Sequence, residues 1–486
     1  MTRGDESAPQ RSLTGWDAED VPAWEAGNST IARRNLLWLI ACDHIAFGVW
    51  TLWPVLALFM PASVYGFSPS DKFLLGATST LVAASLRIPY SLGIAKFGGR
   101  NWTVSSIAVL VIPTAGAMVL LAHPGLPLWP YLVCAGLTGC GGANYSASMT
   151  NTNRLYPQRL KGLALGLNAG VGNLGVPMIQ LVGLLVLATT GHDAPYIVCA
   201  LYLALLVIVG AGATRYLDNL DHATKASHLR EVLSKADTWV LALLYLGSFG
   251  SWIGFSFAFG VVLQTNFTAG GQTPVQASLH AAQFAFIGPA LGSLARIYGG
   301  RLADRLGGSR VTLAVFAAMA VVAGALITIS IASERQSGHG SALMDAYIAT
   351  FVGLFILAGL GNGSVYKMIP SIFEARSHAL NLEESQRRFW SQATSGAVIG
   401  FVATFGALGG VGINLALRQS YLSTGAETSA FWVFIGFYFV AALMTWSRYV
   451  RRPTRTPGRL HDVTTASQSE MDVVPATEPR RGASRP

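Results

Sequence analysis

Long apolar blocks alternate with short polar stretches along most of this chain. A block of about 18 or more apolar residues is long enough to cross a membrane as a helix. The pattern therefore predicts an all-α membrane protein with twelve transmembrane helices. The twelve blocks lie near residues 36–60, 73–97, 102–122, 129–153, 163–189, 195–216, 238–264, 281–303, 311–332, 345–373, 390–417 and 430–447.

Composition agrees with this pattern. Of 486 residues, 52% are hydrophobic and only 12% are charged, and the mean hydropathy is +0.45. Soluble domains carry roughly 25% charged residues, so this chain has about half of that solvating charge. The four cysteines all fall inside apolar blocks without a CxxC pair, which predicts small buried side chains rather than a metal or redox site.

The distribution of lysine and arginine predicts the orientation of the chain. If the N-terminus is cytoplasmic, the cytoplasmic loops and both tails hold 27 of the 33 basic residues. The loops on the other side hold only Lys72, Arg335 and Arg418. Basic residues concentrate on the cytoplasmic side of membrane proteins, so both termini are expected to be cytoplasmic. The net charge of +9 is then a topology signal and does not indicate nucleic-acid binding.

A polar connection near the middle of the chain separates six apolar blocks from six more. The halves also share a local pattern, because Arg87 and Arg296 each precede a Gly-Gly pair by eleven residues. Two six-helix halves of this kind are the layout of the major facilitator superfamily. The expected organisation is a polar cytoplasmic tail (1–35), an N-terminal six-helix bundle (36–217), a cytoplasmic linker (218–237), a C-terminal six-helix bundle (238–449) and a disordered cytoplasmic tail (450–486).

The stretch "GGRLADRLGGSR" (299–310) resembles the cytoplasmic loop signature of that superfamily. Asp304 and Arg305 stand where the signature has an acid and a base. The corresponding first-half stretch, "SLGIAKFGGRNW", keeps the glycines and Arg100 but lacks the acid.

Arg87 and Arg296 lie near the middle of apolar blocks, where a charge costs at least about 2.5–3.5 kcal/mol. Of the 24 acidic residues, only Asp43 lies inside a predicted span, since Asp345 is the first residue of the tenth block, and one carboxylate cannot balance two arginines. The excess positive charge predicts an anionic substrate. Because guanidinium is planar with forked donors, two facing arginines suit a small trigonal anion.

Two blocks are unusually rich in glycine. "GLALGLNAGVGNLGVPMIQ" (162–180) contains a G-x-G-x-x-G match, but it lies mid-block without the strand and the acid that a dinucleotide site requires. Its glycines instead predict smooth helix faces that pack closely and slide, and Asn168 and Asn173 add amide donors that can reach an anion. The second block is 395–417; the glycines expected to act in gating are Gly166, Gly170, Gly175, Gly400, Gly406 and Gly409.

The two glycine-rich blocks resemble the nitrate signatures of the nitrate/nitrite porter (NarK-like) family. The resemblance runs from about Arg34 to Tyr449. It implies that Arg87 and Arg296 clamp nitrate or nitrite. It also places side chains at the cavity wall or near the substrate: Phe47, Tyr145, Phe255, Phe259, Asn168 and Asn173. Tyr145 and Phe255 replace the Phe and Tyr of better-known members.

Two transport modes stay open. In nitrate/nitrite exchange, the empty carrier with two repelling arginines resists closing, so it returns only when loaded. In nitrate–proton symport, Asp43 carries the proton; the alternative for this residue is a side chain near the helix end that reaches back to water. A membrane enzyme or sensor would need a catalytic or metal cluster, and the nine histidines are too scattered for one.

The sequence therefore predicts a transporter rather than an enzyme. No cofactor, metal or nucleic-acid partner is expected. Nitrate, nitrite and the lipid bilayer are the expected partners of a monomer in the bacterial inner membrane.

Overall fold

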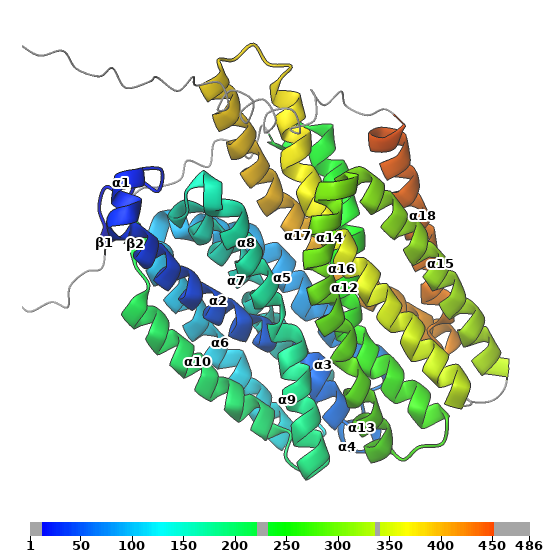
Figure 1. The fold of residues 1–486 in the computed structure, drawn as a ribbon. Helices are drawn as coiled ribbons and strands as arrows, with labels where there is room; N and C mark the ends of the chain where they lie inside the picture. The colour runs from blue at the N-terminus through cyan, green and yellow to red at the C-terminus, as the bar shows by residue number, and fades with distance from the viewer. Residues whose placement is uncertain (1–11, 221–231, 336–340, 452–486) are drawn as a thin grey trace, which may run out of the picture.

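The structure is a computed structural model and describes residues 12–220, 232–335 and 341–451. It is a bundle of long helices in two halves that lie side by side, the first coloured blue to teal and the second green to orange in Figure 1. The predicted disordered tail beyond residue 451, the first eleven residues and most of the predicted linker lie outside the described residues.

The first half opens with a short strand and ends with another. Its elements are β1 (Ser12–Leu13), α1 (Val21–Ala23), η1 (Trp24–Asn28), α2 (Ser29–Trp50), α3 (Leu52–Leu56), η2 (Ala57–Phe59), α4 (Ala62–Tyr65), α5 (Pro69–Phe97), α6 (Gly99–Ala122), α7 (Leu128–Leu155), α8 (Gln158–Asn173), α9 (Gly175–Thr190), α10 (Tyr196–Tyr216) and β2 (Asn219–Leu220).

The second half is helical throughout its described residues. Its elements are α12 (Ala236–Ala269), α13 (Pro274–Ala285), α14 (Ile287–Leu306), α15 (Gly308–Arg335), α16 (Ser341–Ser377), α17 (Glu384–Thr424), α18 (Thr428–Thr445) and η4 (Trp446–Val450).

Each of the twelve predicted blocks corresponds to one helix or to two consecutive helices, except the first, which covers α2, α3 and the short η2. In the described part of the chain, eight helices are long and apolar enough to cross a membrane, or nine if one bent pair counts as a span. The helical fold class is confirmed, while twelve crossings stay a prediction.

Prolines explain three breaks within predicted spans. A proline ring clashes with the carbonyl group four residues earlier, and the interrupted helices end four residues before a proline. The pairs of helix end and proline are Trp50 and Pro54, Asn173 and Pro177, and Ala285 and Pro289. At the first break the helices bend by 46°. Prolines 89, 113 and 370 lie in continuous helices, so a proline alone does not force a break.

The described chain ends lie at one face of the bundle, each bound to a residue next to the central connection. Strand β1 pairs in parallel with β2, which follows α10. At the start of α12, Asp237 accepts a 3.0 Å hydrogen bond from Nε of Arg448, at the end of the last helix. We call this face the terminal face, and the other end of the bundle the opposite face. Between the halves, α5 packs along α17, and α9 packs against α13.

Candidate substrate site

Arg87 projects from α5 toward the second half of the protein. Its side chain is 1% exposed, and Nη1 donates to the carbonyl oxygen of Ala403 in α17. Three rings surround the guanidinium carbon, with centroids 5.8 Å away for Trp50, 5.4 Å for Tyr145 and 5.3 Å for Phe249. Nε and Nη2 have no hydrogen-bond partner among the described residues. Arg87 is thus a buried cation with unused donors inside an aromatic cage.

Arg296 makes the reciprocal contact from α14 toward the first half. With the Asn173 amide oriented to suit both neighbours, its oxygen accepts a 3.0 Å hydrogen bond from Nη1 of Arg296, and its nitrogen donates over 3.3 Å to the carbonyl oxygen of Ala169. The guanidinium carbon lies 4.8 Å from the ring centroid of Tyr366. Each arginine therefore contacts the glycine-rich helix of the other half.

The two arginines form one electrostatic site. Arg87 and Arg296 repel each other across it, and Tyr145, Tyr245 and Tyr366 lie within electrostatic range of both guanidinium groups. A buried charge without a counter-ion is costly. An anion between the two groups would lower this cost by accepting hydrogen bonds from both.

Asp43 lies in α2 and is fully buried. Its Oδ1 accepts a 2.7 Å hydrogen bond from Nδ2 of Asn144 in α7. Gly172 of α8 packs closely against it, because a Cβ added at this glycine would lie 3.3 Å from the Cβ of Asp43. The expectation that this side chain reaches back to water is therefore wrong, because α7 and α8 cover it. The carboxylate attracts Arg87 electrostatically.

Of the other residues predicted for the site in the first half, some lie near the arginines and others join helices of the same half. Phe47 is fully buried, with its ring 5.3 Å from Trp50 and 5.8 Å from Tyr145, so it backs the cage around Arg87. Asn168 donates to the hydroxyl oxygens of Ser148 (2.7 Å) and Thr152 (3.2 Å), which ties α8 to α7 within the first half. Of the two signature asparagines, only Asn173 contacts an arginine.

Phe255 and Phe259 are not brought to the arginines. Their rings stack in an aromatic cluster inside the second half, with contacts to Phe351, Phe355 and Phe434 on α16 and α18. The ring that reaches Arg87 from α12 is Phe249, which sequence reasoning missed.

A repeated motif was the signal for Phe249. Phe47-Gly48-Val49-Trp50 in α2 is matched by Phe249-Gly250-Ser251-Trp252 in α12. Because Phe47 and Trp50 line the first half of the site, the repeat points to the counterpart of Phe47 in the second half.

The predicted gating glycines fall into two classes. At Gly166, Gly170 and Gly400, a Cβ would have no atom within 4 Å. At Gly175 and Gly409 it would lie 1.9 Å from the His44 carbonyl oxygen and 2.2 Å from that of Leu246. Gly406 belongs to the second class, since its Cβ would lie 2.4 Å from the Tyr245 ring.

The positions of these classes along the helices differ. The glycines with open space lie in the part of α8 and α17 nearer the terminal face, and the tightly packed ones lie deeper.

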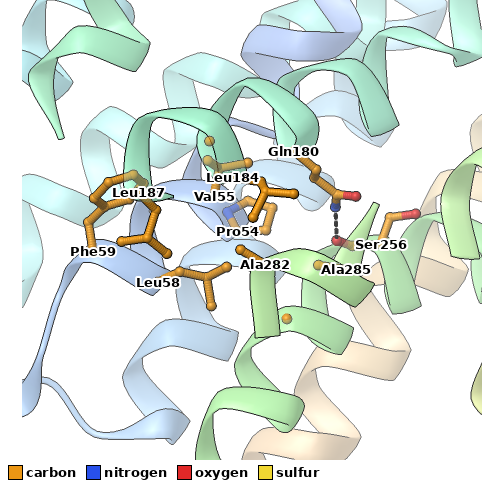
Figure 2. A pocket seen from close by; sticks show the side chains of 12 residues that line it. Pro54, Val55, Leu58, Phe59, Gln180, Leu184, Leu187, Ser256, Ala282 and Ala285 are labelled. Carbon is orange, nitrogen blue, oxygen red and sulfur yellow. Dashed lines mark hydrogen bonds between the residues drawn. The ribbon is translucent and has the colours of Figure 1, made fainter. Parts of the chain in front are cut away.

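On the opposite-face side of the arginines, the halves are in direct contact. Nε2 of Gln180 donates over 3.0 Å to the carbonyl oxygen of Ser256 in the other half. Figure 2 shows this bond beside a small pocket lined by α3, η2, α9, α12 and α13, with Leu58, Leu187 and Ala282 facing it. The bundle is therefore closed on this side.

Lys367 lies outside the site. Its Nζ forms a 2.9 Å ion pair with Asp304 of the loop signature, and both side chains are at least half exposed. It belongs to the terminal face of α14 and α16.

Two helical halves, with a buried cationic site between them, define a multi-pass membrane transporter. The family model of the Major Facilitator Superfamily matches residues 44–413 of the chain. The chain belongs to this superfamily. Nitrate/nitrite transporters that are 35% and 36% identical over 93% and 90% of the chain show that, within the superfamily, it belongs to the nitrate/nitrite porter family.

Curated relatives cover nearly the whole chain. The nitrate/nitrite transporter NarU of Salmonella typhimurium is 35% identical, over 93% of this chain and 99% of the relative. NarU of Escherichia coli is 36% identical, over 90% and 96%. The probable nitrate/nitrite antiporter NarK2 of Thermus thermophilus is 27% identical, over 93% and 99%.

Solved structures support the fold. A bacterial homologue of the human lysosomal transporter Spinster, in an inward-facing and occupied conformation, gives a TM-score of 0.59 at 16% identity, covering 87% of this chain and 98% of the other. The nucleoside transporter NupG gives 0.56 at 15% identity, covering 85% and 99%. At these identities the likeness concerns the fold alone.

Proposed function

We propose that this protein transports nitrate and nitrite by alternating access, with the anion clamped between Arg87 and Arg296. The observation that carries the proposal is a pair of buried arginines, each contacting the opposite half, of which Arg87 also has two donors without a partner among the described residues. A trigonal oxyanion accepts forked hydrogen bonds in a plane, which is the geometry that guanidinium offers. The names of the relatives support the same substrates.

Exchange of nitrate for nitrite is the favoured mode. Without an anion, the repulsion between the two guanidinium groups opposes full closure of the halves around them. A bound anion offsets part of this charge, so the loaded carrier changes conformation more readily than the empty one. Return then requires a second anion, and transport becomes an exchange.

The remaining parts of the proposal follow from charge and packing. The terminal face is the cytoplasmic face of the bacterial inner membrane, because basic residues gather there. The glycines with open space are the surfaces that close together when the opposite face opens. The carrier works as a monomer, since both arginines come from one chain.

Nitrate–proton symport is the second candidate, and the burial of Asp43 favours it. A carboxylate inside a membrane is a functional candidate by default, and this one attracts Arg87. In this mode Asp43 takes up a proton when the anion binds, and releases it with the anion on the other side.

Counterflow in proteoliposomes tests both candidates. Exchange predicts nitrate uptake driven by internal nitrite, with no response to an imposed pH gradient. Uptake into anion-free vesicles that follows the proton gradient, and that fails in Asp43→Asn, would replace exchange by symport. If neither nitrate nor nitrite moves in either format, the proposed substrates are wrong.

A further inference from the structure

A third buried cation, apart from the two arginines, lies at the opposite face of the bundle. Lys72, in the first turn of α5, is only 9% exposed. Its Nζ donates to the carbonyl oxygen of Ala57 over 2.8 Å and to Oε1 of Gln264 over 2.9 Å. Among the described residues, no carboxylate forms an ion pair with it.

Neither capping nor pairing explains a lysine at this position. The first turn of a helix carries the positive end of the helix dipole, which disfavours a cation. The adjacent Asp71 is already engaged, because its Oδ2 accepts from the backbone nitrogen (3.0 Å) and the hydroxyl (2.7 Å) of Ser68. Burial of the ammonium is a further cost, which its two hydrogen bonds offset without a counter-ion.

Lys72 belongs to a network that joins the two halves. Nε2 of Gln264, in α12, donates to the hydroxyl of Ser278 over 2.6 Å and to the carbonyl oxygen of Leu58 over 3.2 Å. His192, between α9 and α10, lies with Nε2 3.0 Å from the same hydroxyl. We call Lys72, His192, Gln264 and Ser278 the outer latch: the first two come from the first half, and the last two from the second.

Lys72 has one hydrogen-bond partner in its own half and one in the other half. Ala57 lies in the same half as Lys72, so this hydrogen bond survives a movement of the halves as units. Gln264 lies in the other half, so its bond to Lys72 breaks when the opposite face opens. The ammonium group has three donors, and two of them are then free at the mouth of the bundle.

We propose that Lys72 is a second anion-binding site, covered by the latch in this conformation and uncovered when the opposite face opens. It takes a small monovalent oxyanion and holds it before the arginine pair does. Lys72 lies toward the opposite face from the Gln180–Ser256 contact, and an unpaired cation at a mouth raises the local anion concentration and the association rate. The inference rests on the proposed function, because it requires the two halves to alternate.

Two substitutions distinguish the effect of the positive charge from the effect of the hydrogen bond between the halves. Gln264→Leu and Lys72→Met both remove the same cross-half bond, but only Lys72→Met removes the charge. The measurement is nitrate KM in right-side-out and inside-out membrane vesicles, with saturating nitrite on the far side. Lys72→Met is expected to raise KM from the opposite-face side by about 3- to 10-fold, with KM from the terminal-face side unchanged. Gln264→Leu is expected to leave both KM values unchanged or to lower the first.

Arg418→Met is the matched control, because it removes another cation near the opposite-face end of α17 and outside the latch. An equal rise in KM for this variant means a general surface potential, and overturns the proposal. Equal effects of Lys72→Met and Gln264→Leu overturn it as well, as does an unchanged KM in Lys72→Met.

The two hypotheses fail in different ways. Wild-type vesicles without nitrate uptake would overturn the proposed function, and this inference with it. Wild-type uptake with the outcomes just named overturns only the second site. Thermal unfolding of each purified variant shows whether the fold is intact.

Discussion

The two halves of the site are built on equivalent helices but carry different side chains at equivalent positions. In α2 and α12, the Phe-Gly-x-Trp repeat aligns Asp43 with Tyr245. The glycines at 162, 166 and 172 in α8 and at 175 in α9 recur 234 residues later in α17, which aligns Asn173 with Ala407. The first half therefore supplies a buried carboxylate and an amide where the second supplies a phenol and a methyl group.

The aligned asparagine and alanine explain how each arginine is held. The side-chain nitrogen of Asn173 donates to the carbonyl oxygen of Ala169, and its side-chain oxygen accepts from Arg296. Ala407 has no side-chain amide to compete for the carbonyl group of Ala403, the counterpart of Ala169, and this carbonyl oxygen accepts from Arg87. The repeat preserved where the arginines lie, while single substitutions changed what they bind.

The largest expected effect concerns the arginine that each half contributes to the site. Arg87→Lys and Arg296→Lys keep the charge but lose the forked donors, and hydrogen bonds to charged groups are worth about 1.5–3 kcal/mol each. We expect counterflow to fall roughly 100-fold or more in both variants, since about 2.7 kcal/mol is a factor of 100. Size-exclusion profiles and thermal unfolding should match the wild type. Full transport in either variant would remove that arginine from the clamp.

The next effect concerns the tightly packed glycines. Gly175→Ala and Gly409→Ala place a methyl group against a backbone carbonyl that cannot move easily. Overpacking of this kind costs typically about 1–3 kcal/mol, so both variants should unfold at lower temperature and lose activity with the fold. Normal unfolding temperatures in both would mean that the contacts seen here are not needed for folding.

The open glycines are expected to behave in the opposite way. Gly166→Ala and Gly400→Ala meet no atom in this conformation, and alanine favours a helix over glycine by about 1 kcal/mol. Stability should be equal or higher, while counterflow falls about 10-fold if a misfit in the opposite-face-open state costs about 1.4 kcal/mol. Undiminished counterflow would mean that these faces do not close together.

A smaller effect tests the difference between the halves. Asn173→Ala makes the first half resemble the second and frees the carbonyl group of Ala169 for Arg296. Because Arg296 gains a substitute partner, nitrate KM should rise only about 3- to 10-fold, or about 0.7–1.4 kcal/mol. Ala407→Asn is the reciprocal variant, and it should compete with Arg87 for the carbonyl group of Ala403. A loss as large as that of Arg296→Lys would show that Asn173 binds the anion itself.

The smallest effect is expected at the carboxylate that only the first half has. In an exchanger, Asp43→Asn should change nitrate/nitrite counterflow by less than about twofold, because the asparagine keeps an oxygen for Asn144. Counterflow at pH 6 and pH 8 is the measurement. A large loss that depends on pH would favour symport.

Composition and block length were enough to predict a helical membrane protein, and the place of Arg87 and Arg296 within apolar blocks was enough to predict that both are buried. They could not choose which face of an apolar helix meets the substrate, because a helix buried in protein and lipid is apolar all round. The four-residue spacing of Phe255 and Phe259 showed a shared face, but that face packs within the second half.

The same limit applies to the polar residues in the spans. Asn168 and Asn173 lie on different faces of one helix, and only their tertiary contacts show that Asn168 joins two helices while Asn173 contacts Arg296. The burial of Asp43 also depends on α7 and α8, far along the chain. Internal repetition was the stronger signal, because it would have identified Phe249 and Tyr245 from the sequence alone.

The ends of each half are tied together. Strand β1 pairs with β2 across the first half, and Asp237 binds Arg448 across the second. Each half is therefore closed on itself and does not depend on the connection between them for its own assembly. Two polypeptides divided within residues 221–231 should then find each other in the membrane and restore a working carrier.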